Sequence, residues 1–291
     1  MHPYNSDPFR VWSTDISNSG PQKFKLPGVK HIIAVASGKG GVGKSTVSAN
    51  LALALSAAGH TVGLLDADIY GPSQGLMMGV PSGTKPEIEG EFLLPIKAHG
   101  LQIMSMGFVT SDRTPAVWRG PMASGALQQL LTQTYWQNVD YLIVDMPPGT
   151  GDIQLTMSQN VPLSGALIVT TPQDIALLDA RKGIEMFRKV EVPLLGIVEN
   201  MSTHICSECG HQENIFGEGG GDAIASDYDI AVIARLPLSM SIRVQSDGGK
   251  PPVISEPDGA ISEIFKGIAR DVHNMIDNVQ IKGPNIQIVD D

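Results

Sequence analysis

A glycine-rich segment, placed between an apolar run and an Ala/Leu-rich stretch, carries the residues with the clearest chemistry. It satisfies the pattern G-x-x-x-x-G-K-[ST] and consists of Gly38, Lys39, Gly40, Gly41, Val42, Gly43, Lys44, Ser45 and Thr46. Glycines let backbone N–H groups turn toward phosphate oxygens, and the start of the following helix attracts negative charge. In this pattern Lys44 reaches the β- and γ-phosphates, and the Ser45 hydroxyl binds Mg²⁺. The segment predicts a nucleotide site.

The same glycines also fit a dinucleotide-binding fingerprint. G-x-G-x-x-G begins at Gly38, and Asp66 follows the next apolar run, where such folds place an acid. Lys44 separates the two patterns, because a dinucleotide site has no use for a buried lysine followed by a metal-binding hydroxyl. Asp145, at the end of the apolar run 141–144, supplies the acid that a nucleoside triphosphate site places near Mg²⁺. We therefore favour a nucleoside triphosphate over a dinucleotide as the ligand of this loop.

The two cysteines of the chain, Cys206 and Cys209, have C-x-x-C spacing. Such thiolates can bind one soft metal centre, because a tight turn brings both sulfurs to one side. One pair is half of the four ligands of a cubane cluster, and a symmetric dimer would complete the set. His204 and His211 flank the pair, so zinc shared by two chains is an alternative. A redox pair or two plain surface thiols would also account for the spacing.

Longer motifs resemble those of the Mrp/ApbC family, which are iron–sulfur cluster carrier ATPases related to MinD and the nitrogenase iron protein. The motifs are DADIYGPS at 66–73, WRGP at 118–121, DMPPGTGD at 145–152 and ENMS at 199–202. They occur in family order, and the resemblance extends from about Gly28 to the C-terminus. It implies a homodimeric, Mg²⁺-dependent ATPase. Such a protein receives a [4Fe–4S] cluster from an upstream donor, binds it through Cys206 and Cys209 of two chains, and delivers it to apo iron–sulfur proteins.

The resemblance also implies roles for single residues. Lys39 matches the second lysine of the deviant Walker A loop, which reaches the partner's nucleotide across a dimer and is catalytic together with Lys44. A solvated loop lysine is the alternative for Lys39. Asp68 would orient the attacking water, and Asp66 would hold Mg²⁺ through water beside Asp145. Capping of a turn is the alternative role for Asp66 and Asp68. Asn200 would read the adenine edge, with a turn-forming asparagine as the alternative.

A rhythm of short apolar runs and helical patterns predicts the elements that position these residues. The predicted strands are residues 31–36, 61–65, 101–106, 141–144, 166–170, 194–198 and 231–234. The predicted helices are residues 45–58, 125–134, 175–190, 222–228 and 259–278. Most of the strands are continuously apolar, as expected for parallel strands covered on both faces.

These elements predict an α/β fold, a single doubly wound and mostly parallel sheet of the MinD-like P-loop NTPase class. We expect one ATPase domain over residues 30–280, with a metal loop at 204–221, after a flexible lead-in at 1–29 and before a tail at 281–291. Residues 71–100 are rich in Gly and Pro and long for a plain loop, which predicts a functional excursion.

The composition of the chain limits the partners and the cellular location that we expect. The chain has 291 residues, 42% of them hydrophobic, and a net charge of −10, which argues against a broad nucleic-acid surface. Two cysteines cannot form a secreted disulfide framework, and no apolar run reaches the ~20 residues that span a bilayer. We expect a cytoplasmic protein without nucleic-acid or membrane partners. The rival is a positioning ATPase of the MinD/ParA type. That class usually needs a basic amphipathic helix for membranes or a basic patch for DNA, and residues 259–278 mix both charge signs.

Overall fold

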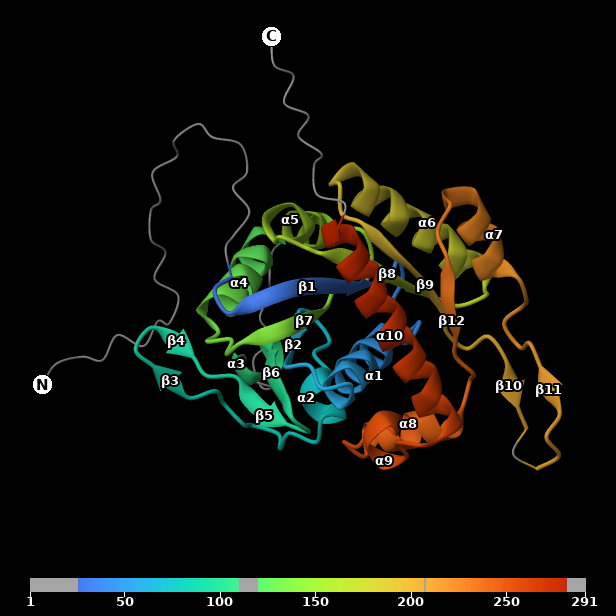
Figure 1. Ribbon diagram of the computed structural model, residues 1–291, viewed down its shortest axis with the longest axis horizontal. Helices are drawn as coiled ribbons and strands as arrows, with labels where there is room; N and C mark the ends of the chain where they lie inside the picture. The colour runs from blue at the N-terminus through green and yellow to red at the C-terminus, as the bar shows by residue number, and fades with distance from the viewer. Residues whose placement is uncertain (1–25, 110–119, 207, 282–291) are drawn as a thin grey trace, which may run out of the picture.

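An eight-stranded sheet forms the centre of the computed structural model, which describes residues 26–109, 120–206 and 208–281 (Figure 1). The strand order is β12-β9-β8-β1-β7-β2-β6-β5. Every neighbouring pair is parallel except β5 and β6. The strands of this sheet are β1 (Val29–Ala36), β2 (Val62–Asp66), β5 (Ile96–Ala98), β6 (Leu101–Ser105), β7 (Val139–Asp145), β8 (Gly165–Thr170), β9 (Leu194–Glu199) and β12 (Val232–Arg235).

Helices cover both faces of the sheet (Figure 1). On one face α1 packs against the central strands and α10 packs against α1, while α4 to α7 lie on the other face. The helices are α1 (Lys44–Ala57), α2 (Gln74–Met77), α3 (Met106–Val109), α4 (Gly120–Gln133), α5 (Asp152–Asn160), α6 (Asp174–Lys189), α7 (Gly220–Tyr228), α8 (Met240–Asp247), α9 (Pro252–Ser255) and α10 (Ala260–Ile281).

In the described part of the chain, two short antiparallel hairpins lie outside the main sheet. One pairs β3 (Ile88–Glu89) with β4 (Phe92–Leu93), and the other pairs β10 (His204–Ile205) with β11 (Gln212–Glu213). The second hairpin projects from the body between β9 and α7 (Figure 1). Its turn contains both cysteines, so the cysteine pair is built on an appendage of the sheet rather than in the core.

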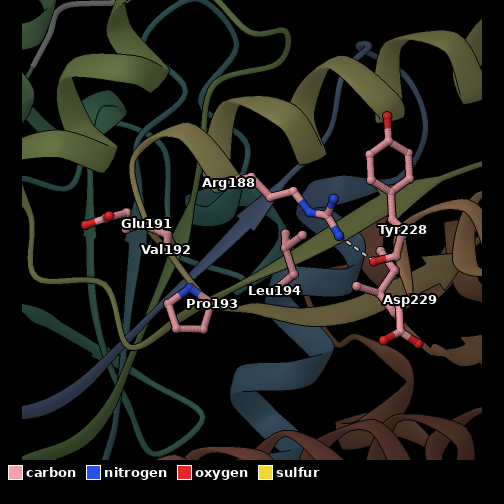
Figure 2. Close-up of a pocket in the computed structure, with 8 residues that line it drawn as sticks. Arg188, Glu191, Val192, Pro193, Leu194, Tyr228 and Asp229 are labelled. Carbon is pink, nitrogen blue, oxygen red and sulfur yellow. Dashed lines mark hydrogen bonds between the residues drawn. The ribbon is translucent and has the colours of Figure 1, made fainter. Parts of the chain in front are cut away.

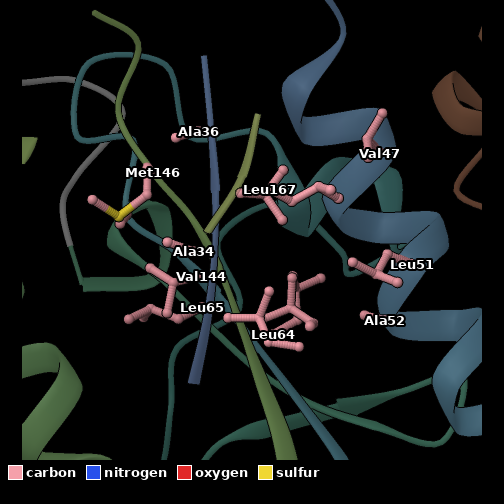
Figure 3. Packing of buried hydrophobic residues seen from close by; sticks show 14 of the residues in the cluster. Ala34, Ala36, Val47, Leu51, Ala52, Leu64, Leu65, Val144, Met146 and Leu167 are labelled. Atoms are coloured by element: carbon pink, nitrogen blue, oxygen red, sulfur yellow. The ribbon is translucent and has the colours of Figure 1, made fainter. Parts of the chain in front are cut away.

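The core between the sheet and α1 is made of aliphatic side chains (Figure 3). Val47 and Leu51 of α1 are fully buried, as are Leu64 of β2 and Leu167 of β8. Burying each such side chain stabilises the fold by about 1.5–3 kcal/mol. All residues of α1 from 47 to 55 are buried, because α10 covers the side of α1 that the sheet does not. The helix that follows the phosphate loop is therefore fixed on both sides.

The seven predicted strands are all present, and their ends differ from the prediction by no more than two residues. The predicted lead-in extends slightly too far, because Val29 already pairs with Val139 in the sheet. The helix predicted from residue 125 begins at Gly120. Trp118 and Arg119 of the WRGP motif, most of the lead-in and most of the tail lie outside the described residues.

The prediction for residues 71–100 is incomplete. This segment contains α2, the β3–β4 hairpin and β5, which pairs antiparallel with β6 at the edge of the sheet. Short strands of two or three residues leave no period in the sequence that could predict them. The prediction also misses α5 and α8, whose Ser, Thr and Gln residues weaken the helical pattern.

Candidate nucleotide and metal sites

The carboxyl ends of the central strands bring the predicted phosphate loop and the predicted acids together. In the parallel register, Asp145 of β7 is paired with Asp66 of β2 on one side and with Val35 of β1 on the other. The loop follows β1, which ends at Ala36, and enters α1 at Lys44. Ligands in open α/β sheets bind at this edge, so the topology places the loop and both acids in one crevice.

Close packing explains two glycines of the loop. Gly43 has φ +87°, and a Cβ there would lie 2.1 Å from Nδ2 of Asn200. A Cβ on Gly38 would lie 2.0 Å from the carbonyl oxygen of Asp179 in α6. The loop is therefore held between α6 and the residue after β9, and only glycine allows both contacts.

Lys44 and Asp145 form a buried ion pair at the start of α1. Nζ of Lys44 lies 2.6 Å from Oδ1 of Asp145, and the side chains are 6% and 0% exposed. The Ser48 hydroxyl donates to the same carboxylate oxygen at 3.0 Å. The Ser45 hydroxyl lies 3.5 Å from Nζ of Lys44. The predicted phosphate-binding lysine thus contacts Asp145 and Ser45, two of the three predicted magnesium-binding groups.

Gln74, which we did not predict, connects the loop to Asp145. Its Nε2 donates to Oδ2 of Asp145 at 2.8 Å and to the carbonyl oxygen of Ser45 at 2.9 Å. Two acceptors fix which end of the amide is nitrogen. Its Oε1 is then buried without a hydrogen-bond partner among the described residues. Together with Ser45 and the two acids, this oxygen gives the all-oxygen donor set that Mg²⁺ prefers, so the residues present fit the ion.

Asp66 is fully buried and accepts hydrogen bonds on both oxygens. Oδ2 accepts from the backbone amides of Ser73 and Gln74 and from the Ser105 hydroxyl, at 2.9–3.1 Å. Burial and the nearby charge of Asp145 raise the pKa of Asp66, whereas the amides of Gln74 and Asp68 oppose that shift. Asp66 therefore organises the loop between β2 and α2, from a strand end that is paired with Asp145.

Asp68 and Lys39 lie nearer the surface than these groups. The backbone amide of Gly71 donates to Oδ1 of Asp68 at 3.2 Å, the contact expected of a turn-capping acid. The Lys39 ammonium makes no ion pair with any carboxylate of the described ranges. It is half-buried in the loop, where Gly40 and Pro148 are exposed neighbours.

Asn200 contacts the phosphate loop directly. Its Nδ2 donates to the carbonyl oxygen of Val42 at 2.8 Å, and its Oδ1 accepts from the backbone amide of Met201 at 2.9 Å. The structure thus places Asn200 beside the loop, where it also makes the local contact expected of a turn-forming asparagine. Thr46 lies at the start of α1, where its carbonyl oxygen accepts from Asn50.

The cysteine pair occupies the turn of the β10–β11 hairpin. The amide of Gly210 donates to the carbonyl oxygen of Cys206 at 2.9 Å, and the amide of Cys206 donates to that of His211 at 2.9 Å. Hydrogen bonds from the amides of Cys209 and Glu208 lower the pKa of Cys206. The thiolate is the form that binds metal, so this turn is suited to a metal ligand.

The flanking histidines do not complete a metal site within one chain. Nδ1 of His204 faces Oε1 of Glu213 at 3.3 Å, across the hairpin. Within residues 26–109, 120–206 and 208–281, no group of three or more His, Cys, Asp or Glu side chains is arranged to hold a metal ion. Both cysteines are free thiols with partial or full exposure, so a four-ligand centre on this turn needs a second pair of ligands from elsewhere.

A separate hollow of about 440 Å³ lies at the other end of the sheet (Figure 2). It is lined by the loop before β9, by Leu194 and by the ends of α6 and α7. The guanidinium of Arg188 lies 4.9 Å from the ring centre of Tyr228 and donates to the carbonyl oxygen of that residue. Because this hollow is at the amino end of β9, it is not part of the crevice that contains Lys44.

Comparisons with known proteins point to one family. The family described as NUBPL iron-transfer P-loop NTPase matches residues 28–273. The iron–sulfur cluster carrier protein of Pseudomonas fragi is 63% identical over 245 residues, which cover 84% of this chain and 85% of that protein. The carrier protein of Escherichia coli is 57% identical over 84% of this chain and 66% of its own length. The mouse iron–sulfur cluster transfer protein NUBPL is 49% identical over 92% and 84%.

Solved structures confirm the predicted fold. A nucleotide-binding protein from Archaeoglobus fulgidus in complex with ADP has a TM-score of 0.70 at 37% identity, covering 82% of this chain and 93% of that one. The cell division ATPase MinD of Pyrococcus furiosus has a TM-score of 0.63 at 21% identity, covering 84% and 99%, and shows the fold alone. The resemblance to the Mrp/ApbC family is likewise confirmed. The chain therefore belongs to the NUBPL-type iron-transfer P-loop NTPase family.

Proposed function

We propose that this protein is a Mg²⁺-dependent ATPase that carries a [4Fe–4S] cluster as cargo between two copies of the chain and transfers it to apo-proteins. The observation that carries the proposal is the position of Cys206 and Cys209. They form a thiolate-stabilising turn on a hairpin that projects from a nucleotide-binding body, and they supply two ligands where a cubane cluster takes four. Cysteine pairs from two copies would complete the set.

The crevice supplies groups suited to phosphoryl transfer to water, which depends mainly on positioning and charge stabilisation. Lys44 would bind the β- and γ-phosphates, for which it must exchange its contact with Asp145 for one with phosphate. Ser45, Asp145, Asp66 and Gln74 would hold Mg²⁺, which neutralises phosphate charge. Asp68 would orient the attacking water. Lys39 would act on the nucleotide of the other copy.

The rival proposal, a positioning ATPase that binds membranes, lacks an available amphipathic face on α10. Phe265, Ile268, Val272 and Ile276 of α10 are buried, and α10 packs against α1. The apolar stripe that would enter a lipid surface is thus used in the core. In the described part of the chain, no helix combines the length and apolarity needed to cross a bilayer.

The proposal is tested by anaerobic reconstitution with iron and sulfide. The wild-type protein is expected to gain the visible absorption of a [4Fe–4S] cluster, with about four irons per dimer, and to elute as a dimer. Cys206→Ala and Cys209→Ala should each abolish that absorption. An unchanged spectrum in either variant would overturn the cysteine assignment.

Matched variants separate the cluster from zinc. His204→Asn and His211→Asn leave the thiols intact, so they should leave cluster binding unchanged. Binding of zinc instead of iron and sulfide, with a zinc affinity that falls in the histidine variants, would identify a zinc-bridged dimer.

Lys44→Ala should abolish ATP hydrolysis while the cysteine pair still takes up a cluster.

A further inference from the structure

Two adjacent residues at the end of β9 hold two different parts of the protein. The side chain of Asn200 donates to the carbonyl oxygen of Val42 in the phosphate loop at 2.8 Å. The side chain of the preceding residue, Glu199, accepts at 2.7 Å from the backbone amide of Gly221 at the start of α7. One dipeptide therefore contacts the nucleotide crevice and the segment that follows the cysteine hairpin.

Glu199 anchors both ends of the segment that carries the cysteine hairpin. The chain leaves β9 at this residue, forms β10 and β11, and returns to the body at the first turn of α7. The bond from Gly221 to Glu199 ties the return point to the departure point. Arg235 of β12 reinforces the tie, because its Nε lies 3.4 Å from Oε1 of Glu199 and its guanidinium also pairs with Asp222 of α7.

The rest of the hairpin has little support from the body. A hollow of about 480 Å³ lies at its base, lined by Glu199, Ser202, Asn214, Gly219 and Arg235 among others. The contacts that do hold the base include the amide of Leu238, which donates to the carbonyl oxygen of Thr203 at 2.9 Å. With open space beneath it, the direction of the hairpin depends on how its two ends are fixed.

Glu199 is a buried carboxylate whose interactions with Gly221 and Arg235 offset the cost of its burial. Its side chain is 3% exposed, whereas that of Arg235 is 46% exposed. A buried carboxylate is costly unless it is paired and hydrogen-bonded, and Glu199 is both. An apolar residue at the end of a buried strand would have packed without this cost, so a carboxylate there indicates a need to hold α7.

We propose that Glu199 is a positioning residue that couples the phosphate loop to the cysteine hairpin. A nucleotide that shifts the loop also shifts Asn200, and through the shared backbone it shifts Glu199 and the anchored end of the hairpin. Coupling of this kind makes the exposure of the cysteines depend on the bound nucleotide. The inference rests on the proposed nucleotide site, but it does not require that a cluster be bound.

The test measures the reactivity of the two thiols in the cluster-free protein. Labelling with an aromatic disulfide is followed with and without Mg-ADP, and with a non-hydrolysable ATP analogue. In the wild type we expect the labelling rate to change about fivefold or more with nucleotide, as typical coupling energies give. Glu199→Ala should bring that ratio close to one, while nucleotide affinity measured by calorimetry stays within about twofold, since Glu199 does not contact the loop.

Two further variants make the result specific. Glu199→Gln keeps an acceptor for Gly221 but loses the charge that pairs with Arg235, so it should fold and show an intermediate ratio even if the alanine variant does not fold. Glu213→Gln changes the carboxylate that faces Nδ1 of His204 at 3.3 Å across the hairpin, far from Glu199 in the chain. It should alter the basal labelling rate and leave the nucleotide ratio unchanged.

A wild-type ratio near one, or a wild-type ratio retained in Glu199→Ala and Glu199→Gln, would overturn the coupling. Failure of the proposed function is a different result. If reconstitution gives no cluster but thiol labelling still responds to nucleotide through Glu199, the coupling stands and the cargo must be reassigned. If a cluster binds and labelling does not respond, the cargo stands and Glu199 is only structural.

Discussion

The ammonium group of Lys44 lies 2.6 Å from Oδ1 of Asp145, so the lysine of the phosphate loop and the acid of β7 neutralise each other inside the protein. Ser48 and Gln74 add hydrogen bonds to the two oxygens of the same carboxylate. The pair therefore contributes to the stability of the fold as well as to the crevice. In the proposed function, Lys44 would leave Asp145 to bind phosphate, and Mg²⁺ that arrives with the nucleotide would then offset the charge of Asp145.

Removal of Lys44 alone should destabilise the protein. Lys44→Met leaves the charge of Asp145 buried without its cation, and the free energy of unfolding should fall by about 3–5 kcal/mol. Lys44→Met combined with Asp145→Asn removes both charges and should regain a large part of that loss. Urea unfolding of the two variants checks the prediction, and equal losses in both would contradict it.

Lys39 should act on the nucleotide of a partner copy. Lys39→Ala and Lys44→Ala are each expected to lose ATP hydrolysis. In a mixed dimer, one site combines an intact Lys44 with an intact Lys39 from the other chain, so mixing the variants should restore about a quarter of wild-type activity at random pairing. The measurement is phosphate release as a function of mixing ratio. No recovery after exchange of subunits would show that Lys39 acts within its own chain or that no dimer forms.

Gln74 should affect both stability and the dependence of nucleotide binding on Mg²⁺. Gln74→Leu removes the donors to Asp145 and to the carbonyl oxygen of Ser45, at a cost of about 1–3 kcal/mol. It also removes the buried oxygen that fits the ion, so calorimetry should show that Mg²⁺ strengthens ADP binding less than in the wild type.

The matched control for Gln74 is Gln102, another buried glutamine. Both ends of its amide are bonded to the backbone of Gln137, away from the crevice. Gln102→Leu should lose a comparable amount of stability with no change in the effect of Mg²⁺. If the two variants give the same calorimetric profile, Gln74 has a structural role only.

Substitution of Gly43 by alanine should disturb the site through a clash with Asn200 as well as through backbone strain. Gly43→Ala places a Cβ in the space of the Asn200 amide and adds about 1–2 kcal/mol of left-handed strain. Gly59, at φ +95° and with no atom near its Cβ position, is the control for strain alone. Both variants should lose stability, and only Gly43→Ala should bind ADP weakly. Equal ADP affinity would contradict the contact.

Asp140 should make part of the free energy of unfolding depend on pH in the acidic range. Hydrogen bonds from Lys30 and from the Thr61 amide lower the pKa of Asp140. A carboxyl whose pKa is lower in the folded state stabilises the protein above the unfolded value of about 4, and this contribution is lost as the pH falls through the folded pKa. Since the ion pair is at the surface, the contribution at neutral pH should be about 1 kcal/mol or less.

The variant Asp140→Asn checks this sign. Urea unfolding at pH 7 should show the wild type as more stable, and the difference should shrink as the pH falls below about 4 and through the lowered pKa of Asp140. Lys30→Met, which removes the main cause of the shift, should show the same convergence with a smaller amplitude. A difference that grows as the pH falls would contradict the prediction.

Local signals in the sequence were sufficient for the sheet and for the phosphate loop. The continuous apolar runs predicted every strand of the parallel part. That β1, β2 and β7 are neighbours, with their carboxyl ends at one edge, is seen only in the structure. The loop was predictable because glycines, lysine and hydroxyl are adjacent in the chain. Asp66 and Asp145 were predictable because each ends an apolar run.

Contacts between distant segments could not be predicted in this way. Gln74 lies in a segment that the sequence marked only as Gly/Pro-rich, and its role depends on a contact with Asp145, 71 residues away. Glu199 was noted as part of a motif, but its bond to Gly221 across the hairpin leaves no spacing signal. The available clue was a carboxylate directly after a buried apolar run, a place where an unpaired charge is costly.

The placement of the cysteines on an appendage has a consequence for protein engineering. β10 and β11 form a sheet of their own, separate from the eight-stranded sheet, and β10 touches the body through a single bridge between His204 and Leu238 among the described residues. The hairpin is therefore a nearly independent unit. Its metal preference should be open to redesign by exchange of residues 204–213 without repacking the scaffold. A lineage that lost the hairpin could keep the nucleotide machinery and adopt a different cargo.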